Sequence, residues 1–93
     1  MDYITSQHSN NFEHNYEQLS TRERQVTEKI VQGLPNKRIA NELFICERTV
    51  KFHCNNIYRK LNIQNRNKLI AQYFQHQYRE VQRLESWAVW MAF

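Results

Sequence analysis

Residues 38–61 read RIANELFICERTVKFHCNNIYRKL, and the rest of the chain is organised around this stretch. Apolar residues recur at helical spacing on both sides of a short gap, which Phe44-Ile45-Cys46 fills. The first set is Ile39, Ala40 and Leu43, and the second set is Val50, Cys54, Ile57 and Leu61. Each set fits one face of an α-helix, so the stretch predicts a short helix, a tight turn and a longer helix, the pattern of a helix-turn-helix.

The face of the second predicted helix opposite its apolar set carries basic, amide and aromatic side chains. They fall at positions i, i+3, i+4, i+7 and i+11 and are Arg48, Lys51, Phe52, Asn55 and Arg59. Such side chains contact phosphates and base edges when a helix lies in the major groove of DNA. We expect Lys51 to contact DNA and Asn55 to contact either adenine or a phosphate. Phe52 would either pack on a thymine methyl group or shield a neighbouring residue in the free protein.

The net charge of +4 is unevenly distributed along the chain. Residues 1–18 contain three acidic residues and no Lys or Arg, whereas residues 19–69 contain eleven Lys or Arg against four Glu. Residues 70–93 are balanced. Because the positive charge coincides with the predicted helix-turn-helix, it favours a polyanionic partner. Charge alone leaves open the alternative of a solvated basic face with no binding role.

Further helices are predicted on both sides of this stretch. Ser20 and Glu23 have the spacing of a capping box, which starts a helix, and Gly33 follows that helix as a residue that tolerates positive φ. Asn65 is a favourable N-cap for a last helix. No Gly or Pro follows Asn65, so we expect that helix to continue through Glu85 or further.

With these motifs in view, residues 19–74 resemble the LuxR/GerE-type DNA-binding domain, also called FixJ-type. The matching pieces are Leu19-Ser20-x-Arg22-Glu23, Gly33-Leu34-Pro35-Asn36-Lys37-x-Ile39-Ala40, Leu43-x-Ile45, Thr49-Val50-Lys51-x-His53-x-x-Asn56-Ile57-x-x-Lys60-Leu61 and Asn65-Arg66. The resemblance implies an all-α, four-helix domain whose third helix enters the major groove, and transcriptional regulation by a dimer on a two-fold DNA site. The predicted DNA-binding residues are Lys37, Arg48, Thr49, Lys51, Phe52, Asn55 and Arg59. Among these we expect Arg48, Thr49 and Arg59 to contact phosphates.

The chain departs from the family pattern at Cys46, where the family usually has Ser or Thr as the N-cap of the recognition helix. A thiol is a poor hydrogen-bond acceptor, so we expect a weakened cap there. The family pattern also places Glu23 and Arg66 near the junction of the first and last helices, where we expect them to pair. Asn56 is expected to tie the recognition helix to a neighbouring loop.

The last predicted helix carries a heptad pattern. Its seam consists of Ile70, Phe74, Gln77, Val81, Leu84, Ala88 and Met91. We therefore expect a long helix that pairs with a second copy of the chain through Ile70, Phe74, Val81, Leu84, Trp87 and Met91. The alternative is a helix that stops near Tyr78 and is followed by a second helix folded back over the core.

Several classes of function are not favoured by the sequence. We find no catalytic triad, no glycine-rich phosphate loop and no paired catalytic carboxylates, so we do not expect an enzyme or a cofactor. Cys46, His53 and Cys54 do not form a closed set of metal ligands. Two cysteines and the absence of a long apolar run favour a cytoplasmic protein, at the bacterial nucleoid, with no membrane partner.

We expect a stand-alone regulator with three parts: a flexible N-terminal arm or short irregular cover (1–18), whose Phe12 and Tyr16 could pack on the domain, the DNA-binding domain (19–74) and a helical extension for dimerisation or partner binding (75–93). Its partners would be double-stranded DNA and a second copy of itself. A second hypothesis keeps the DNA-binding core but assigns the aromatic C-terminal tail to another protein. In that case the chain would be a protein-interaction module that modulates another transcription regulator or RNA polymerase.

Overall fold

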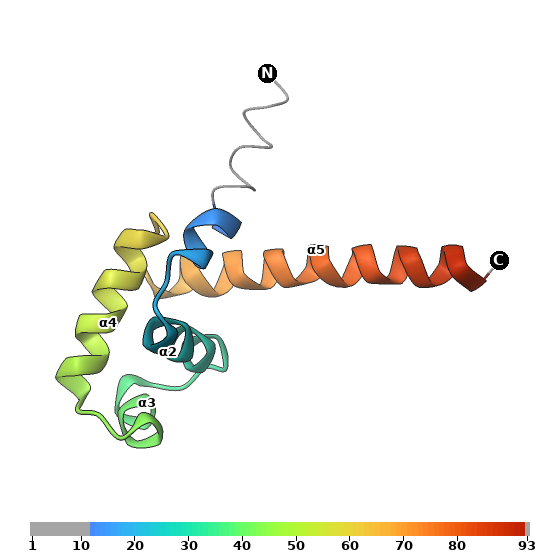
Figure 1. The fold of residues 1–93 in the computed structure, drawn as a ribbon. Coiled ribbons are helices and arrows are strands. Elements are labelled where there is room, and N and C mark those ends of the chain that lie inside the picture. Colours follow the sequence, from blue (N-terminus) through green and yellow to red (C-terminus); the bar gives the residue numbers. More distant parts are fainter. Residues whose placement is uncertain (1–11, 93) are drawn as a thin grey trace.

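The computed structural model describes residues 12–92, and their side chains as far as residue 79. Over these residues the chain is helical and contains no strand. The main helices are α2 (Thr21–Val31), α3 (Asn36–Leu43), α4 (Glu47–Lys60) and α5 (Arg66–Ala92). Helices α2, α3 and α4 pack against one another, α2 also packs against the first turns of α5, and the rest of α5 projects away from this bundle (Figure 1). The all-α fold with a helix-turn-helix and an extended C-terminal helix is therefore confirmed.

The start of α2 is fixed by the capping box that the sequence predicted. The Ser20 hydroxyl accepts a hydrogen bond from the Glu23 amide at 3.1 Å, and the Glu23 carboxylate accepts one from the Ser20 amide at 2.9 Å. Two backbone amides that the helix itself cannot satisfy are thereby paired. The start of α5 is capped in a similar way, because Asn65 Oδ1 accepts from the Lys68 amide at 2.9 Å.

Helices α2, α3 and α4 all end in the same backbone motif. One residue takes a positive φ, and the amide of the next, apolar residue donates to a carbonyl five residues back. The positive-φ residues are Gly33 (88°), Phe44 (57°) and Asn62 (55°). The apolar residues are Leu34, Ile45 and Ile63, and each packs on the core. This is the Schellman motif, which satisfies the last carbonyls of a helix and turns the chain back toward the bundle.

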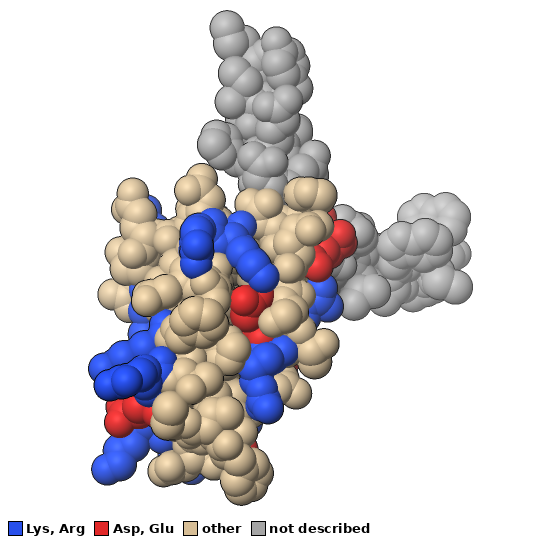
Figure 2. Space-filling view, turned by 60° about the vertical axis from the view of Figure 1, so that its left-hand side comes forward, with Lys and Arg blue, Asp and Glu red and all other residues tan. Residues whose placement is uncertain are grey.

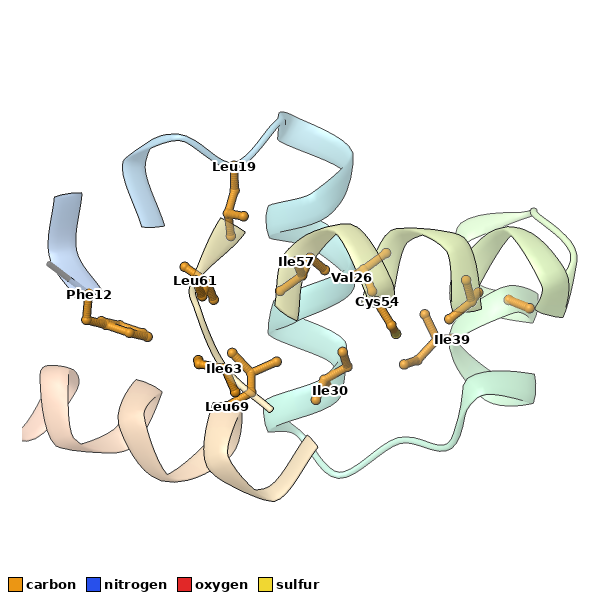
Figure 3. Packing of buried hydrophobic residues seen from close by; sticks show 12 residues of the cluster. Phe12, Leu19, Val26, Ile30, Ile39, Cys54, Ile57, Leu61, Ile63 and Leu69 are labelled. Atoms are coloured by element: carbon orange, nitrogen blue, oxygen red, sulfur yellow. The ribbon is translucent and has the colours of Figure 1, made fainter. Parts of the chain in front are cut away.

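The hydrophobic core lies where α2, α4 and the beginning of α5 meet (Figure 3). Val26 and Ile30 of α2 face Ile57 of α4 and Leu69 of α5, and all four side chains are 0% exposed. The full buried set is Phe12, Leu19, Val26, Ile30, Ile39, Ala40, Val50, Cys54, Ile57, Leu61, Ile63 and Leu69. Six of the seven apolar positions predicted in residues 39–61 therefore belong to the core and make up half of it, and they fix the position of α4 on the bundle.

The segment before α2 differs from the expected flexible arm. Residues 12–17 are helical, and Phe12 is buried. The Phe12 ring lies 5.8 Å from the His76 ring, and the Tyr16 ring lies 6.1 Å from the Tyr73 ring. Arg24 lies over the Tyr16 ring at 5.6 Å from its centre. These contacts join residues 12–17 to α2 and α5, so this segment belongs to the packed domain.

Helix α5 is continuous from Arg66 to Ala92, as the absence of Gly and Pro predicted. The alternative of a second helix that folds back after Tyr78 is wrong. Leu69 is buried, and Ile70 and Tyr73 pack partly against the core. After these turns the helix leaves the bundle (Figure 1).

The expected pairing of Glu23 with Arg66 is also wrong. Glu23, which is 5% exposed, accepts a hydrogen bond at 2.8 Å from Lys60 at the end of α4. Arg66 donates instead to the Leu34 carbonyl and, at 3.0 Å, to Asn36 Oδ1. The two residues therefore act at different junctions: Glu23 joins α2 to α4, and Arg66 joins α5 to the start of α3.

Candidate nucleic-acid interface

The two faces of α4 have opposite character. Val50 and Ile57 are 0% exposed and Cys54 is 5% exposed, so one face belongs to the core. The other face is exposed and carries Arg48, Lys51, Phe52, Asn55 and Arg59. We call these five residues the α4 outer face. Because the inner face is buried against α2 and α3, the orientation of the outer face is set by the fold.

Two further residues of the predicted DNA-binding set lie beside this face. Thr49 is half-buried in the first turn of α4, and Lys37 is exposed on α3. Lys37, Arg48 and Lys51 form no ion pair with another described residue, so their charges are free to meet a ligand. The structure thus brings the α4 residues to one surface and places Lys37 on the neighbouring helix.

Lys and Arg side chains recur across the side of the molecule that carries α4, and acidic side chains form only small areas between them (Figure 2). Some of the positive charge counted in the sequence is already neutralised. Glu42 accepts from Lys29 at 2.8 Å and from Arg38 at 3.0 Å. These two hydrogen bonds lower the pKa of the Glu42 carboxyl, with the bond from Lys29 as the larger cause. Lys29 and Arg38 are therefore less suited to DNA contact than Lys37, Arg48 and Lys51.

The N-terminus of α4 lacks a side-chain cap, where the sequence predicted a weakened one. Cys46 occupies the N-cap position with φ −86° and ψ 161° and makes no capping hydrogen bond. Its thiol is exposed and lies 3.1 Å from Thr49 Oγ1. The hydrogen bond with the Thr49 side chain is the main cause of a lowered pKa at the Cys46 thiol.

Asn56 does not tie α4 to a loop, contrary to the sequence-based expectation. Its Oδ1 accepts a hydrogen bond from Arg59, three residues further along the same helix. Residues three apart are neighbours on a helix surface, so the spacing of Asn56 and Arg59 in the sequence could have predicted this hydrogen bond. The contact orients the Arg59 guanidinium on the α4 outer face, and this is a role for Asn56 that the sequence reasoning missed.

Phe52 is 61% exposed in the middle of the α4 outer face. Its ring contacts the ring of His53 edge-on, with 5.8 Å between their centres. The Nδ1 atom of His53 is buried and has no hydrogen-bond partner among the described residues. Phe52 therefore covers one side of His53 but leaves most of its own ring open to solvent.

Within the described part of the chain, no group of three or more His, Cys, Asp or Glu residues is placed to hold a metal ion. Among the same residues, no helix has the length and hydropathy needed to cross a membrane.

The fold and the exposed cationic helix define a helix-turn-helix domain of the DNA-binding class. Residues 17–72 match the model of the family "Bacterial regulatory proteins, luxR family", and the chain belongs to this family. It is therefore a LuxR-type DNA-binding domain of transcription regulators, and the family is not an enzyme class.

Two relatives illustrate the similarity in sequence. The chain is 46% identical over 57 residues to the nitrate/nitrite response regulator protein homolog of Haemophilus influenzae, covering 61% of this chain and 27% of that protein. It is 43% identical over 54 residues to the spore germination protein GerE of Bacillus subtilis, covering 58% of this chain and 73% of that protein.

A solved structure, that of the response regulator StyR, superposes with a TM-score of 0.72 at 35% identity. The match covers 80% of this chain and 37% of StyR. In the sequence matches above, the aligned part of this chain spans about a quarter of the length of the Haemophilus influenzae response regulator and most of the length of GerE.

Proposed function

We propose that this chain is a sequence-specific transcription regulator that places α4 in the major groove of duplex DNA. The observation that carries the proposal is the α4 outer face. It presents two free cations, an amide and an aromatic ring on a helix whose opposite face is locked into the core. A helix held in this way presents its side chains at fixed positions, which base-specific contact requires.

Within this interface, the residues have different proposed tasks. Lys51 lies on the exposed face in the first half of α4, the part of a recognition helix that approaches base edges most closely, and Asn55 follows one turn later on the same face. Lysine pairs with the acceptors of guanine, and asparagine pairs with adenine. Arg48, Thr49 and Arg59 on α4, together with Lys37 on α3, would contact phosphates and hold the domain in register.

We further propose that the chain acts as a homodimer through α5. Phe74 is 54% exposed although it is a large apolar residue, and Ile70, one turn earlier, is only partly covered by the core. Both belong to the predicted heptad seam. The side chains of the other proposed dimerisation residues, Val81, Leu84, Trp87 and Met91, lie outside the described residues.

A two-fold dimer would present two copies of α4 to the same face of the DNA. Half-sites one helical turn apart require recognition helices about 34 Å from each other. The target would therefore be a site with two-fold symmetry. The family match supports DNA binding, and it gives no support to the alternative in which the DNA-binding core is kept but the C-terminal tail acts on another protein.

The DNA-binding proposal is tested by selecting bound sequences from a random duplex library, followed by affinity measurements at several salt concentrations. We expect a two-fold consensus and an affinity that falls steeply as salt rises, because bound phosphates release counterions. Binding without a consensus, or no binding to duplex DNA, would contradict the proposal.

The dimer proposal is tested by truncation after Tyr78, with sedimentation and DNA binding as the two measurements. We expect the truncated chain to lose the dimer and its preference for the two-fold site together. A truncated chain that still dimerises and binds the same site would contradict the seam. Residues 75–93 would then be available to another protein, such as a regulator or RNA polymerase. The far-ultraviolet circular dichroism of the truncated chain, which should keep its helical signal, serves as the control for folding.

A further inference from the structure

Phe52 is an unusual residue for its position. It is 61% exposed, and its only described ring contact is with His53. Around it on the α4 outer face are cations and an amide, namely Arg48, Lys51, Asn55 and Arg59. Exposure of an apolar ring to water is unfavourable, so its position on this face favours a binding partner that offers an apolar group to the ring.

The neighbours of Phe52 restrict what that partner can be. An apolar protein surface placed over the ring would also remove water from Arg48 and Lys51, which have no ion-pair partner among the described residues. Burying unpaired charges is costly. Duplex DNA has no such cost, because phosphates pair with the cations while the ring enters the groove between them. The partner of Phe52 is therefore the same DNA that the proposed function assigns to α4.

In the major groove, most exposed groups of the bases are hydrogen-bond donors or acceptors. The C5-methyl group of thymine is the largest apolar group there. A phenylalanine ring has no hydrogen bond to offer, so placing it against guanine O6 or cytosine N4 would remove water from a polar group without replacement. We infer that Phe52 is a specificity-determining residue that selects thymine through contact with this methyl group. The inference rests on the proposed function and adds one base to its target.

The methyl group can be tested separately from the rest of the base. In the sequence obtained by selection, each thymine is replaced in turn by deoxyuridine, which lacks only the C5-methyl group. We expect one thymine in each half-site at which the replacement weakens binding by about fourfold, the effect of exposing one buried methyl group. 5-Bromodeoxyuridine at that position, with a bromine of nearly methyl size, should restore the affinity.

The role of Phe52 is tested by combining the DNA change with a protein change. Phe52→Ala should bind the thymine and deoxyuridine sites equally, whereas Phe52→Leu, which keeps an apolar side chain, should retain part of the preference. Phe44→Ala is the matched control. Phe44 is also an exposed phenylalanine, 92% exposed, but it lies in the turn between α3 and α4, and its loss should leave the fourfold difference intact. Thermal melts of all three variants verify that they fold.

The outcomes separate this inference from the proposed function. A clear consensus with no thymine sensitive to deoxyuridine would overturn the role of Phe52 while DNA recognition by α4 stands. A deoxyuridine effect that persists in Phe52→Ala would assign the methyl contact to another residue and would also overturn the inference. The absence of any duplex binding would overturn both.

Discussion

The two faces of α4 are governed by different constraints. On the inner face, Val50, Cys54 and Ile57 are at most 5% exposed, so their volume and shape must fit the core. On the outer face, Lys51 and Asn55 are exposed, and their side chains make no hydrogen bond or ion pair with another described residue. The periodicity of a single helix thus places the residues needed for folding on one face and those proposed for binding on the other. Substitutions on the inner face should therefore change stability, and those on the outer face should change DNA affinity.

The largest expected effect is on the inner face, at Ile57. Its side chain is 0% exposed and lies in the middle of the core (Figure 3). Ile57→Ala removes buried methyl and methylene groups and leaves a cavity, which should lower the free energy of unfolding by about 2–5 kcal/mol. Urea denaturation followed by circular dichroism measures the change. A loss below 1 kcal/mol would show that the core rearranges to fill the cavity.

A second, smaller effect is expected at the ion pair that joins α4 to α2. Glu23→Gln removes the charge that accepts hydrogen bonds from Lys60 at 2.8 Å and from the Ser20 amide at 2.9 Å. Because hydrogen bonds to charged groups stabilise more than neutral ones, the loss should be about 1.5–3 kcal/mol of stability at neutral pH. Glu42→Gln is the matched control. Its ion pairs lie in a more exposed setting, and its effect should be clearly smaller.

The Glu23 effect should depend on pH. Burial raises the pKa of the Glu23 carboxyl, but the hydrogen bonds from Lys60 and Ser20 outweigh it and lower the pKa below its ordinary value of 4.5. A carboxyl with a lowered pKa in the folded state stabilises the fold above its unfolded-state pKa. It loses that contribution as the pH falls through the folded-state pKa. The stability difference between the parent and Glu23→Gln should therefore persist at pH 7 and shrink below pH 4.5. A constant difference across this range would contradict the pairing.

On the outer face, Lys51→Ala and Asn55→Ala should leave the melting temperature unchanged and weaken binding to the selected DNA site. A lost base contact should cost about 1–3 kcal/mol of binding free energy. Fluorescence anisotropy with the selected duplex and with a scrambled duplex measures affinity and preference. Parental affinity and preference in both variants would show that another surface recognises DNA.

Arg59→Ala is the comparison for those two variants on the same face. As a proposed phosphate contact, it should weaken binding to all sequences alike and reduce the slope of log affinity against log salt by about one. An altered sequence preference in this variant would instead assign Arg59 to base recognition.

The features that could be predicted from the sequence are those set by near neighbours. The Ser20–Glu23 box, the positive φ at Gly33, the Asn65 cap and the two apolar sets of residues 39–61 each depend on residues within one or two turns. The partner of Glu23 could not be predicted in this way. Lys60 is 37 residues distant in sequence, and its approach depends on how α4 crosses α2.

Tertiary contacts also explain the other differences. Residues 12–17 have no helical periodicity of their own, and a segment that short is not stable alone. Packing of Phe12 and Tyr16 against α5 supplies what the sequence signal lacks. Phe44 and Asn62 adopt a positive φ where glycine would be expected, because the following residues, Ile45 and Ile63, gain burial in the core.

A last and smaller effect is expected at the first turn of α4, at its N-cap residue Cys46. The N-cap of α2 is Ser20, whose hydroxyl accepts a hydrogen bond from the Glu23 amide. The N-cap of α4 is Cys46, which makes no capping hydrogen bond although its backbone already has the extended conformation of an N-cap. Cys46→Ser supplies a hydroxyl oxygen without changing the size of the side chain much. The thiol is exposed, so no core packing is lost. An added N-cap should raise the melting temperature by roughly 4–8 °C. Cys46→Ala, which has no acceptor, should give no increase and so separates capping from removal of the thiol. A melting temperature of Cys46→Ser equal to that of the parent, with a lower value for Cys46→Ala, would show that the contact between the Cys46 thiol and Thr49 already stabilises this end of α4 as well as a hydroxyl cap would.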